Sequence, residues 1–309
     1  MKAVIIWILK GMAMGAANVI PGVSGGTIAL ITGIFRRLIN AIKSFDLNAL
    51  KLLLNLQFKA FAEAVDLKFL ASVGLGILLA IVSLARLFDY LFTYYPVYIW
   101  AFFFGLVLAS VYFVGKRIEH WNTAVILAFI IGTAVAVTIT SLHPATQNDS
   151  FFYLLLCGVV AIVSMILPGL SGSFVLILMG NYKLIAIDAV NNLDLNILLP
   201  VAVGAAVGLV AFSHVLSWLF NKYADLTLAV LTGFILGSLK ILWPWQEQIY
   251  LMENGEFLLK HGEKIPAYTQ PYLPESFDQT VVFAIFFVLL GIFTVYAIER
   301  LAKIEGDEA

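Results

Sequence analysis

The same glycine-rich phrase occurs twice within apolar sequence, and it constrains the fold more than any other feature of the chain. The copies are PGVSGGTIALITGIF at residues 21–35 and PGLSGSFVLILMGNY at residues 168–182, with five of fifteen positions identical. Proline and glycine interrupt helices, and lipid tolerates interrupted backbone only where protein or a polar cavity surrounds it. Two such breaks at equivalent places are typical of a transporter whose binding site lies at the breaks.

The composition predicts a membrane protein. Hydrophobic residues make up 62% of the 309 residues and charged residues only 12%. Such a chain cannot cover its core with polar surface, so we expect an all-α polytopic membrane protein. The net charge of −1 gives no reason to expect a nucleic-acid partner. The single cysteine, Cys157, lies in an apolar run, so we expect a buried side chain, no disulfide, no metal site and no cofactor.

A second pair of segments indicates an internal repeat. YLFTYYPVYIWAFFFGLVLAS at residues 90–110 aligns without gaps with WLFNKYADLTLAVLTGFILGS at residues 218–238, and seven of the 21 positions are identical. We predict a first repeat over residues 1–140 and a second over 151–309, each with a broken or re-entrant helical hairpin followed by three transmembrane helices. The predicted hairpins are 3–40 and 151–190, and the predicted transmembrane helices are 69–92, 97–115, 122–140, 197–220, 226–242 and 279–301.

The distribution of lysine and arginine predicts the orientation. These residues gather in the polar stretch 36–68, in the link 116–120 and in the C-terminal tail, whereas the link 141–150 has none and the predicted loop 243–278 is acidic and aromatic. The positive-inside rule then predicts cytoplasmic N- and C-termini, an external loop at 243–278 and inverted repeats. We expect the hairpin tips to converge near the midplane, although the same parity would allow each hairpin to cross fully twice. The stretch 44–68 is predicted to form an amphipathic helix on the cytoplasmic leaflet.

Small and hydroxyl-bearing residues follow the proline of each break. A helix N-terminus presents free backbone N–H groups and the positive end of the helix dipole, so each break is a candidate anion site with phosphate as the expected ligand. The same small residues could instead serve close helix packing. The candidate substrate-binding residues are Pro21, Gly22, Ser24, Gly25, Gly26, Thr27, Pro168, Gly169, Ser171, Gly172 and Ser173.

Charged residues inside the predicted spans are a second set of candidates. Arg86 and Asp89 lie three residues apart on one helical face, and Arg86 aligns with His214 of the second repeat. We interpret Arg86 as a candidate phosphate ligand, and Asp89 or His214 as a candidate coupling group. Alternatively, Arg86 and Asp89 reach the external headgroups and His214 is a hydrogen-bonded histidine of the bundle. Groups that could bond the backbone freed at the breaks, or touch substrate, are Lys10, Asn18 and Asn181.

The segment GMAMGAANVIPGVSGGTIALITGIF followed by ILPGLSGSFVLILMGNY resembles the PopT-type polyprenyl-phosphate transporters, a family long described as a bacterial domain of unknown function. The resemblance covers essentially the whole chain, with both motifs in the right order. It implies a flippase that returns undecaprenyl phosphate, the lipid carrier of cell-wall and peptidoglycan synthesis, across the bacterial cytoplasmic membrane. The expected partners are therefore a polyprenyl phosphate lipid and membrane lipids.

The residues alone leave two other functions open. One is a small-anion channel or an ion-coupled transporter that uses the same breaks. The other is a membrane phosphatase acting on polyprenyl pyrophosphate, which needs a nucleophile beside an acid or a base. The four histidines are scattered along the sequence without such a cluster. We therefore expect a transporter and not an enzyme.

Overall fold

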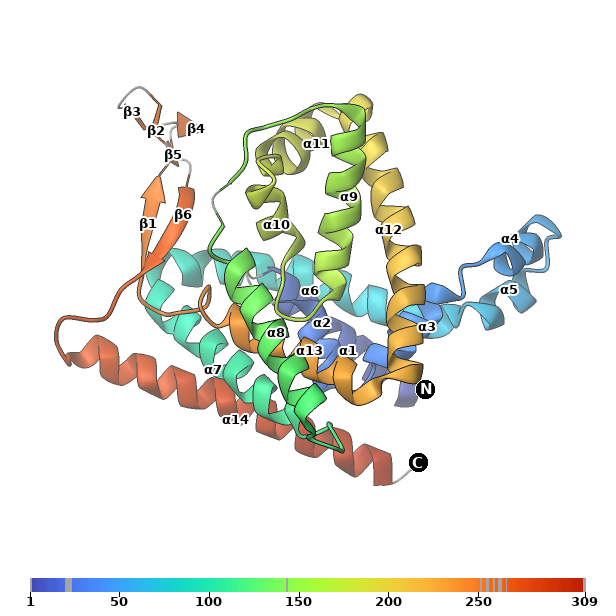
Figure 1. Cartoon of the computed structure of the whole chain (residues 1–309), viewed down its shortest axis with the longest axis horizontal. Coiled ribbons are helices and arrows are strands. Elements are labelled where there is room, and N and C mark those ends of the chain that lie inside the picture. The colour runs from blue at the N-terminus through green and yellow to red at the C-terminus, as the bar shows by residue number, and fades with distance from the viewer. Residues whose placement is uncertain are drawn as a thin grey trace.

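The protein is mostly helical, and the first half of the chain contains eight helices within the described residues (Figure 1). The computed structural model describes residues 2–19, 24–142, 144–250, 252–253, 256–257, 259–260, 263–264 and 266–307. The helices of the first half are α1 (Lys2–Val19), α2 (Gly25–Ile31), α3 (Phe35–Lys43), α4 (Leu47–Leu54), α5 (Phe58–Ala64), α6 (Leu67–Tyr94), α7 (Pro96–Gly115) and α8 (Thr123–Ile139).

The second half is also mostly helical and contains a short β-structure. The segment 243–278, predicted as an external loop, contains antiparallel strands, of which β1 (Gln246–Tyr250) and β6 (Pro266–Pro271) are the longest. The short strands pair as β2 (Met252–Glu253) with β3 (Glu256–Phe257), and as β4 (Leu259–Lys260) with β5 (Glu263–Lys264). The helices are α9 (Phe151–Ile166), α10 (Gly172–Leu178), the π-helix η1 (Lys183–Ala189), α11 (Val190–Asn192), α12 (Leu195–Lys222), α13 (Ala224–Ser238) and α14 (Gln279–Asp307).

Among the described residues, four helices are long and apolar enough to cross a membrane. They contain the stretches 67–84, 96–115, 195–222 and 279–300, and four further apolar helices have 10–17 residues. The chain is a multi-pass membrane protein, as its composition predicts. The predicted span 226–242 forms a shorter α-helix, because α13 ends at Ser238 and the chain continues in tighter turns, with Ile241 N donating to Ser238 O at 3.0 Å.

The two halves have matching local geometry at corresponding positions. Ser24 precedes α2 with φ −106° and ψ 132°, and Ser171 precedes α10 with φ −116° and ψ 133°. Each of these short helices has seven residues and is followed by a glycine of positive φ, 75° at Gly33 and 71° at Gly180. Likewise α6 and α12 both have 28 residues. The sequence similarity therefore extends to turns and helix ends.

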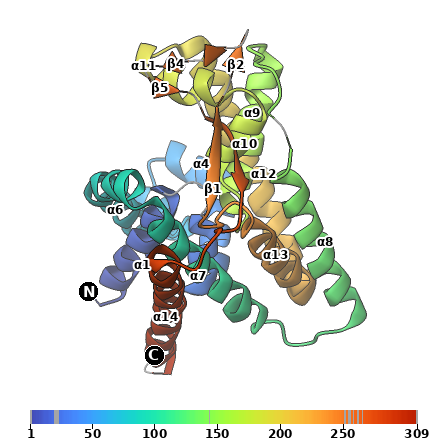
Figure 2. The same ribbon diagram turned by 90° about the vertical axis from the view of Figure 1, so that its left-hand side faces the viewer.

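Long helices pack in four pairs, and two of these pairs join the halves. Helix α1 lies along α6 and α9 along α12, whereas α7 of the first half lies along α14 and α8 along α13 (Figure 2). Each interface has glycine where the backbones approach closely. A Cβ at Gly76 would collide with the Ile8 carbonyl across α1 and α6, and a Cβ at Gly291 with the Phe102 carbonyl across α14 and α7. Small residues allow such contacts between membrane helices.

The stretch 44–68 projects from the body on the right of Figure 1 as two short helices rather than one. The Asp46 carboxylate caps α4 by accepting hydrogen bonds from Asn48 N and Ala49 N at 2.8 and 2.9 Å. The break between α4 and α5 falls at Leu56, whose φ of 57° is incompatible with a continuing right-handed helix. Large apolar side chains, including Leu54 and Phe58, are exposed on this projection.

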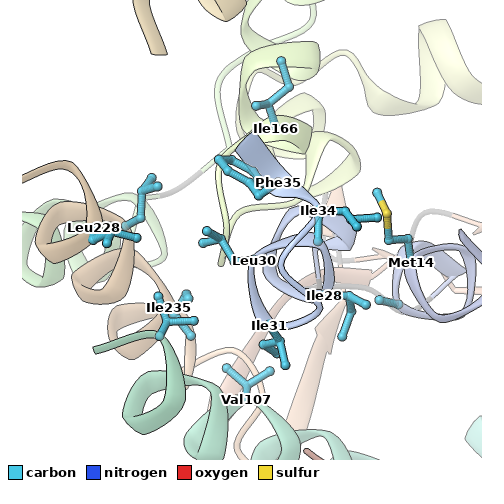
Figure 3. Packing of buried hydrophobic residues seen from close by; sticks show 14 of the residues in the cluster. Met14, Ile28, Leu30, Ile31, Ile34, Phe35, Val107, Ile166, Leu228 and Ile235 are labelled. Atoms are coloured by element: carbon cyan, nitrogen blue, oxygen red, sulfur yellow. The ribbon is translucent and has the colours of Figure 1, made fainter. Parts of the chain in front are cut away.

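The hydrophobic core surrounds α2. Every residue of this short helix is buried. Figure 3 shows Leu30 and Ile31 of α2 among side chains from other elements, including Val107 of α7 and Ile235 of α13. Because α2 is too short to be stable alone, its position depends on this packing and on the bonds at its two ends.

Candidate functional site at the two helix breaks

The N-terminal end of α2 is capped by side chains of its own segment. Ser24 Oγ accepts a hydrogen bond from Gly26 N at 3.1 Å, and Asn18 Oδ1 of α1 accepts one from Gly25 N at 2.8 Å. Both amides would otherwise be available to an anion, since the first turn of a helix lacks internal acceptors. Two of the donors predicted for a substrate therefore bond to the protein itself.

The two breaks are in direct contact, although 141 or more residues separate the bonded partners in the sequence. The Ser24 hydroxyl lies 3.2 Å from both Met165 O and Leu167 O, and it donates to these carbonyls at the end of α9. In return, Gly169 N donates to Thr27 Oγ1 at 3.2 Å. Ser24 and Thr27 are 2% and 1% exposed, so the hydrogen bonds between the breaks lie in the core.

The second break is more open than the first. Ser171 precedes α10 without a capping bond from its side chain. Instead, its hydroxyl lies 2.8 Å from that of Ser173. Ser173 is exposed, Ser171 is half-buried, and Pro168, Gly169 and Gly172 are buried. Within the described part of the two breaks, the hydroxyl pair of Ser171 and Ser173 is thus accessible to a ligand.

Two cations hold the C-terminal end of α2. Arg117 donates from Nη1 to Leu30 O and from Nη2 to Ile31 O, both at 2.6 Å, and Lys10 Nζ donates to Thr32 O at 3.0 Å. Burial lowers the pKa of the Arg117 guanidinium, and the Glu299 carboxylate opposes this shift. Cations at the carbonyl end of a helix interact favourably with its dipole. The role of Arg117 was missed in the sequence, where it appears only as part of a basic link.

The asparagines that flank the breaks bond to backbone. Besides the Asn18 cap, the buried Asn181 side chain donates to Asn148 O at 2.7 Å and accepts from Asn148 N at 3.0 Å. Of the two interpretations given above, these contacts favour satisfaction of backbone groups over contact with substrate. Asn181 thereby ties the segment after α10 to the link before α9.

Of the remaining predicted residues, the structure describes the side chain of His214. Pro21 and Gly22 lie outside the described residues, as do the side chains of Arg86 and Asp89, whose backbone belongs to α6. His214 is exposed on α12, and its Nδ1 lies 2.9 Å from Val210 O of its own helix. This hydrogen bond is thus within α12, and no contact joins His214 to the described residues of either break.

A polar contact between α3 and α12 was also missed in the sequence. Ser217 Oγ donates to Asn40 Oδ1 at 3.0 Å, and Lys43 Nζ lies 3.4 Å from the same hydroxyl. Ser217 is buried. In the sequence, Ser217 is simply a serine within an apolar stretch, and this does not reveal whether its hydroxyl bonds to another helix. Among the described residues, no group of three or more His, Cys, Asp or Glu side chains could hold a metal ion.

Comparisons with known proteins identify relatives over most of the chain. The family described as undecaprenyl phosphate translocase-like matches residues 14–258. A polyprenyl-phosphate transporter of Vibrio cholerae is 38% identical over 301 residues, which are 96% of each chain. A polyprenyl-phosphate transporter of Staphylococcus aureus is 32% identical over 265 residues, 77% of this chain and 85% of the relative. No solved structure matches the chain significantly. These names denote transporters and not enzymes, as the sequence predicts.

Proposed function

The chain belongs to the undecaprenyl phosphate translocase-like family, and from this premise we propose that it moves undecaprenyl phosphate across the bacterial cytoplasmic membrane for reuse in cell-wall synthesis. The names of both relatives support a polyprenyl phosphate as the substrate class. The proposal includes cytoplasmic termini, inverted repeats and hairpins that enter from opposite faces. The matching geometry at Ser24 and Ser171 supports the repeat.

The observation that carries the proposal is the contact between the two breaks beside an accessible hydroxyl pair. A lipid phosphate needs donors for its head, while its apolar tail stays in the bilayer. Ser171 and Ser173 offer hydroxyl donors at the surface of the second break. We propose that the head first meets this pair and then passes between the second break and the segment from Ser24 to Thr27.

The hydrogen bonds between the breaks give this route a closed state. The Ser24 hydroxyl donates to Met165 O and Leu167 O, and Gly169 N donates to Thr27 Oγ1. While these bonds exist, the two donors do not point at a substrate. Passage of a phosphate therefore requires these bonds to open and be replaced by bonds to the head. An exchange of one set of hydrogen bonds for another has a modest net free energy, which suits a reversible step.

The experiment is trans-leaflet movement of labelled polyprenyl phosphate in proteoliposomes. The double variant Ser171→Ala/Ser173→Ala is expected to lower the flux by at least about tenfold, since loss of even one bond to a charged head costs roughly 1.5–3 kcal/mol. Ser83→Ala is the matched control, because Ser83 is exposed and bonds to Leu79 O of its own helix. Wild-type flux in the double variant would refute the assigned route, and no flux in the wild type would refute the function.

A further inference from the structure

A cavity of about 460 Å³ lies away from the contact between the breaks, where the link between α7 and α8 meets the corner between α12 and α13. Three segments distant in sequence each contribute a cation to its lining. Arg36 comes from the first turn of α3, Arg117 from the link, and Lys222 from the last turn of α12. Two carboxylates, Glu119 and Asp225, also line it. The lining charges therefore give an excess of one positive charge.

One of the two carboxylates has its oxygens directed at backbone. Asp225 Oδ1 accepts from Glu119 N and Oδ2 from His120 N, both at 3.1 Å. These bonds fasten the link to the first turn of α13, and so fix the wall of the cavity. Asp225 makes no ion pair with the three cations in the described part of the chain, and its Oδ2 lies 3.7 Å from the His120 imidazole Nδ1.

Two of the three cations rest on aromatic rings. The Arg36 guanidinium lies 5.0 Å from the centre of the Phe220 ring, and Lys222 Nζ lies 5.3 Å from that of Tyr223. Within the described residues, neither forms an ion pair with a carboxylate. The neighbouring Arg37 differs, because it pairs with Asp66 at 2.7 Å. Arg36 and Lys222 are thus positioned by cation–π contacts and not by direct ion pairs, although Glu119 and Asp225 line the same cavity.

The position of the cavity relates it to the translocation route. Arg117 lines the cavity and also donates to Leu30 O and Ile31 O at the C-terminal end of α2. In both Figure 1 and Figure 2, the corner between α12 and α13 and the C-terminus lie toward the lower side, opposite the β-hairpins. By the positive-inside rule this is the predicted cytoplasmic end.

We infer that this cavity is a second binding site for the phosphate head of the lipid, at the cytoplasmic end of its path. The inference rests on the proposed function. Arg36 and Lys222 bind the phosphate oxygens, because guanidinium and ammonium groups are the side chains best suited to this anion. Arg117 adds charge to the lining of the cavity while it holds α2. The headgroup thus occupies a site distinct from the Ser171 and Ser173 pair.

The test is equilibrium binding of labelled polyprenyl phosphate to the full-length protein in nanodiscs, with thermal unfolding as a check on folding. The double variant Arg36→Gln/Lys222→Gln is expected to raise the Kd at least about tenfold, the effect of losing one charge-assisted bond. Lys116→Gln removes a cation from the same link without touching this cavity, so its Kd is expected to stay within about twofold. The single variant Arg36→Lys keeps the positive charge, so it is expected to retain most of the affinity of the wild type.

Separate outcomes distinguish the inference from the function on which it rests. If the wild type binds and moves the lipid while the double variant binds it equally well, the cavity assignment is wrong and the function stands. If the wild type neither binds nor moves the lipid, the function itself fails. A parallel titration with inorganic phosphate identifies the source of the anion. The lipid assignment is overturned if the variants raise the Kd for free phosphate and leave the Kd for the lipid unchanged.

Discussion

The hydroxyl of Ser24 lies 3.2 Å from the carbonyl oxygen of Leu167, so a side chain of the first break is bonded to the backbone of the second. The same hydroxyl accepts a bond from Gly26 N and thereby caps α2. One buried oxygen consequently stabilises both a local helix end and a long-range contact. The predictions below separate these two roles from the binding of substrate.

Removing this hydroxyl is expected to destabilise the protein. Ser24→Ala removes the acceptor of the buried Gly26 amide and the donor shared by Met165 O and Leu167 O, which costs roughly 1–3 kcal/mol of unfolding free energy. Thermal unfolding in detergent measures the change. Ser83→Ala serves as the control, since Ser83 is exposed. An unfolding temperature equal to that of the wild type would mean that the contact between the breaks contributes nothing to stability.

A methyl group at the start of α2 is expected to separate the breaks. In Gly26→Ala the new Cβ would lie 2.5 Å from Ile166 O, a distance that requires the backbone to move. We expect a loss of about 1–3 kcal/mol from overpacking, together with altered flux. Gly74→Ala is the matched comparison, because nothing lies within 4 Å of a Cβ there. In α6 that change should be neutral or stabilise by up to about 1 kcal/mol. Equal stabilities of the two variants would contradict this explanation.

Loss of the guanidinium that bonds to the C-terminal end of α2 should destabilise the protein. Arg117→Ala deletes the bonds to Leu30 O and Ile31 O, and we expect a cost of about 2–3 kcal/mol, measured by thermal unfolding. The stability of Arg117→Lys should fall between those of the wild type and Arg117→Ala, because an ammonium lacks the planar fork that reaches both carbonyls. Lys116→Ala, next in sequence and exposed, provides the control. An Arg117→Ala protein as stable as Lys116→Ala would refute the capping role.

The cap of α4 is expected to respond to acid. Hydrogen bonds from backbone amides, chiefly Ala49 N, lower the pKa of Asp46 below its ordinary value of 3.8. A lowered folded pKa means that the stabilisation is complete above that ordinary value and is lost as the pH falls through the folded pKa. Amide exchange at Asn48 and Ala49, corrected for intrinsic rates, should therefore accelerate only under strongly acidic conditions. In Asp46→Asn the acceleration should disappear, and its persistence would assign the response to another group.

The helix breaks could be predicted from the sequence because their causes are local. Proline, glycine and serine mark the sequence ahead of α2 and ahead of α10, and the duplicated spacing predicts that both halves share the pattern. The alignment of residues 90–110 with 218–238 likewise places Tyr95 opposite Tyr223, and each separates consecutive helices, with φ of −135° and −137°. Signals of this kind depend on neighbouring residues alone, so one sequence is enough to recognise them.

The partners at the breaks could not be predicted, because they depend on tertiary packing. Nothing near Ser24 in the sequence specifies Leu167 as its acceptor, and Arg117 lies 87 residues from Leu30. The break at Leu56 was missed for another reason, since an apolar residue of positive φ carries no turn signal. The symmetric anion site expected at the two tips likewise presumed free donors, whereas Asn18 and Ser24 already occupy the first tip.

The pairing of α7 with α14 constrains how the protein is made. Helix α7 ends at Gly115, but its neighbour begins only at Gln279, so the ribosome must synthesise the whole intervening segment before the two can meet. At ordinary elongation rates this interval lasts on the order of ten seconds. During biogenesis the glycine-bearing face of α7 consequently stays in contact with lipid or with insertion factors until α14 has been inserted.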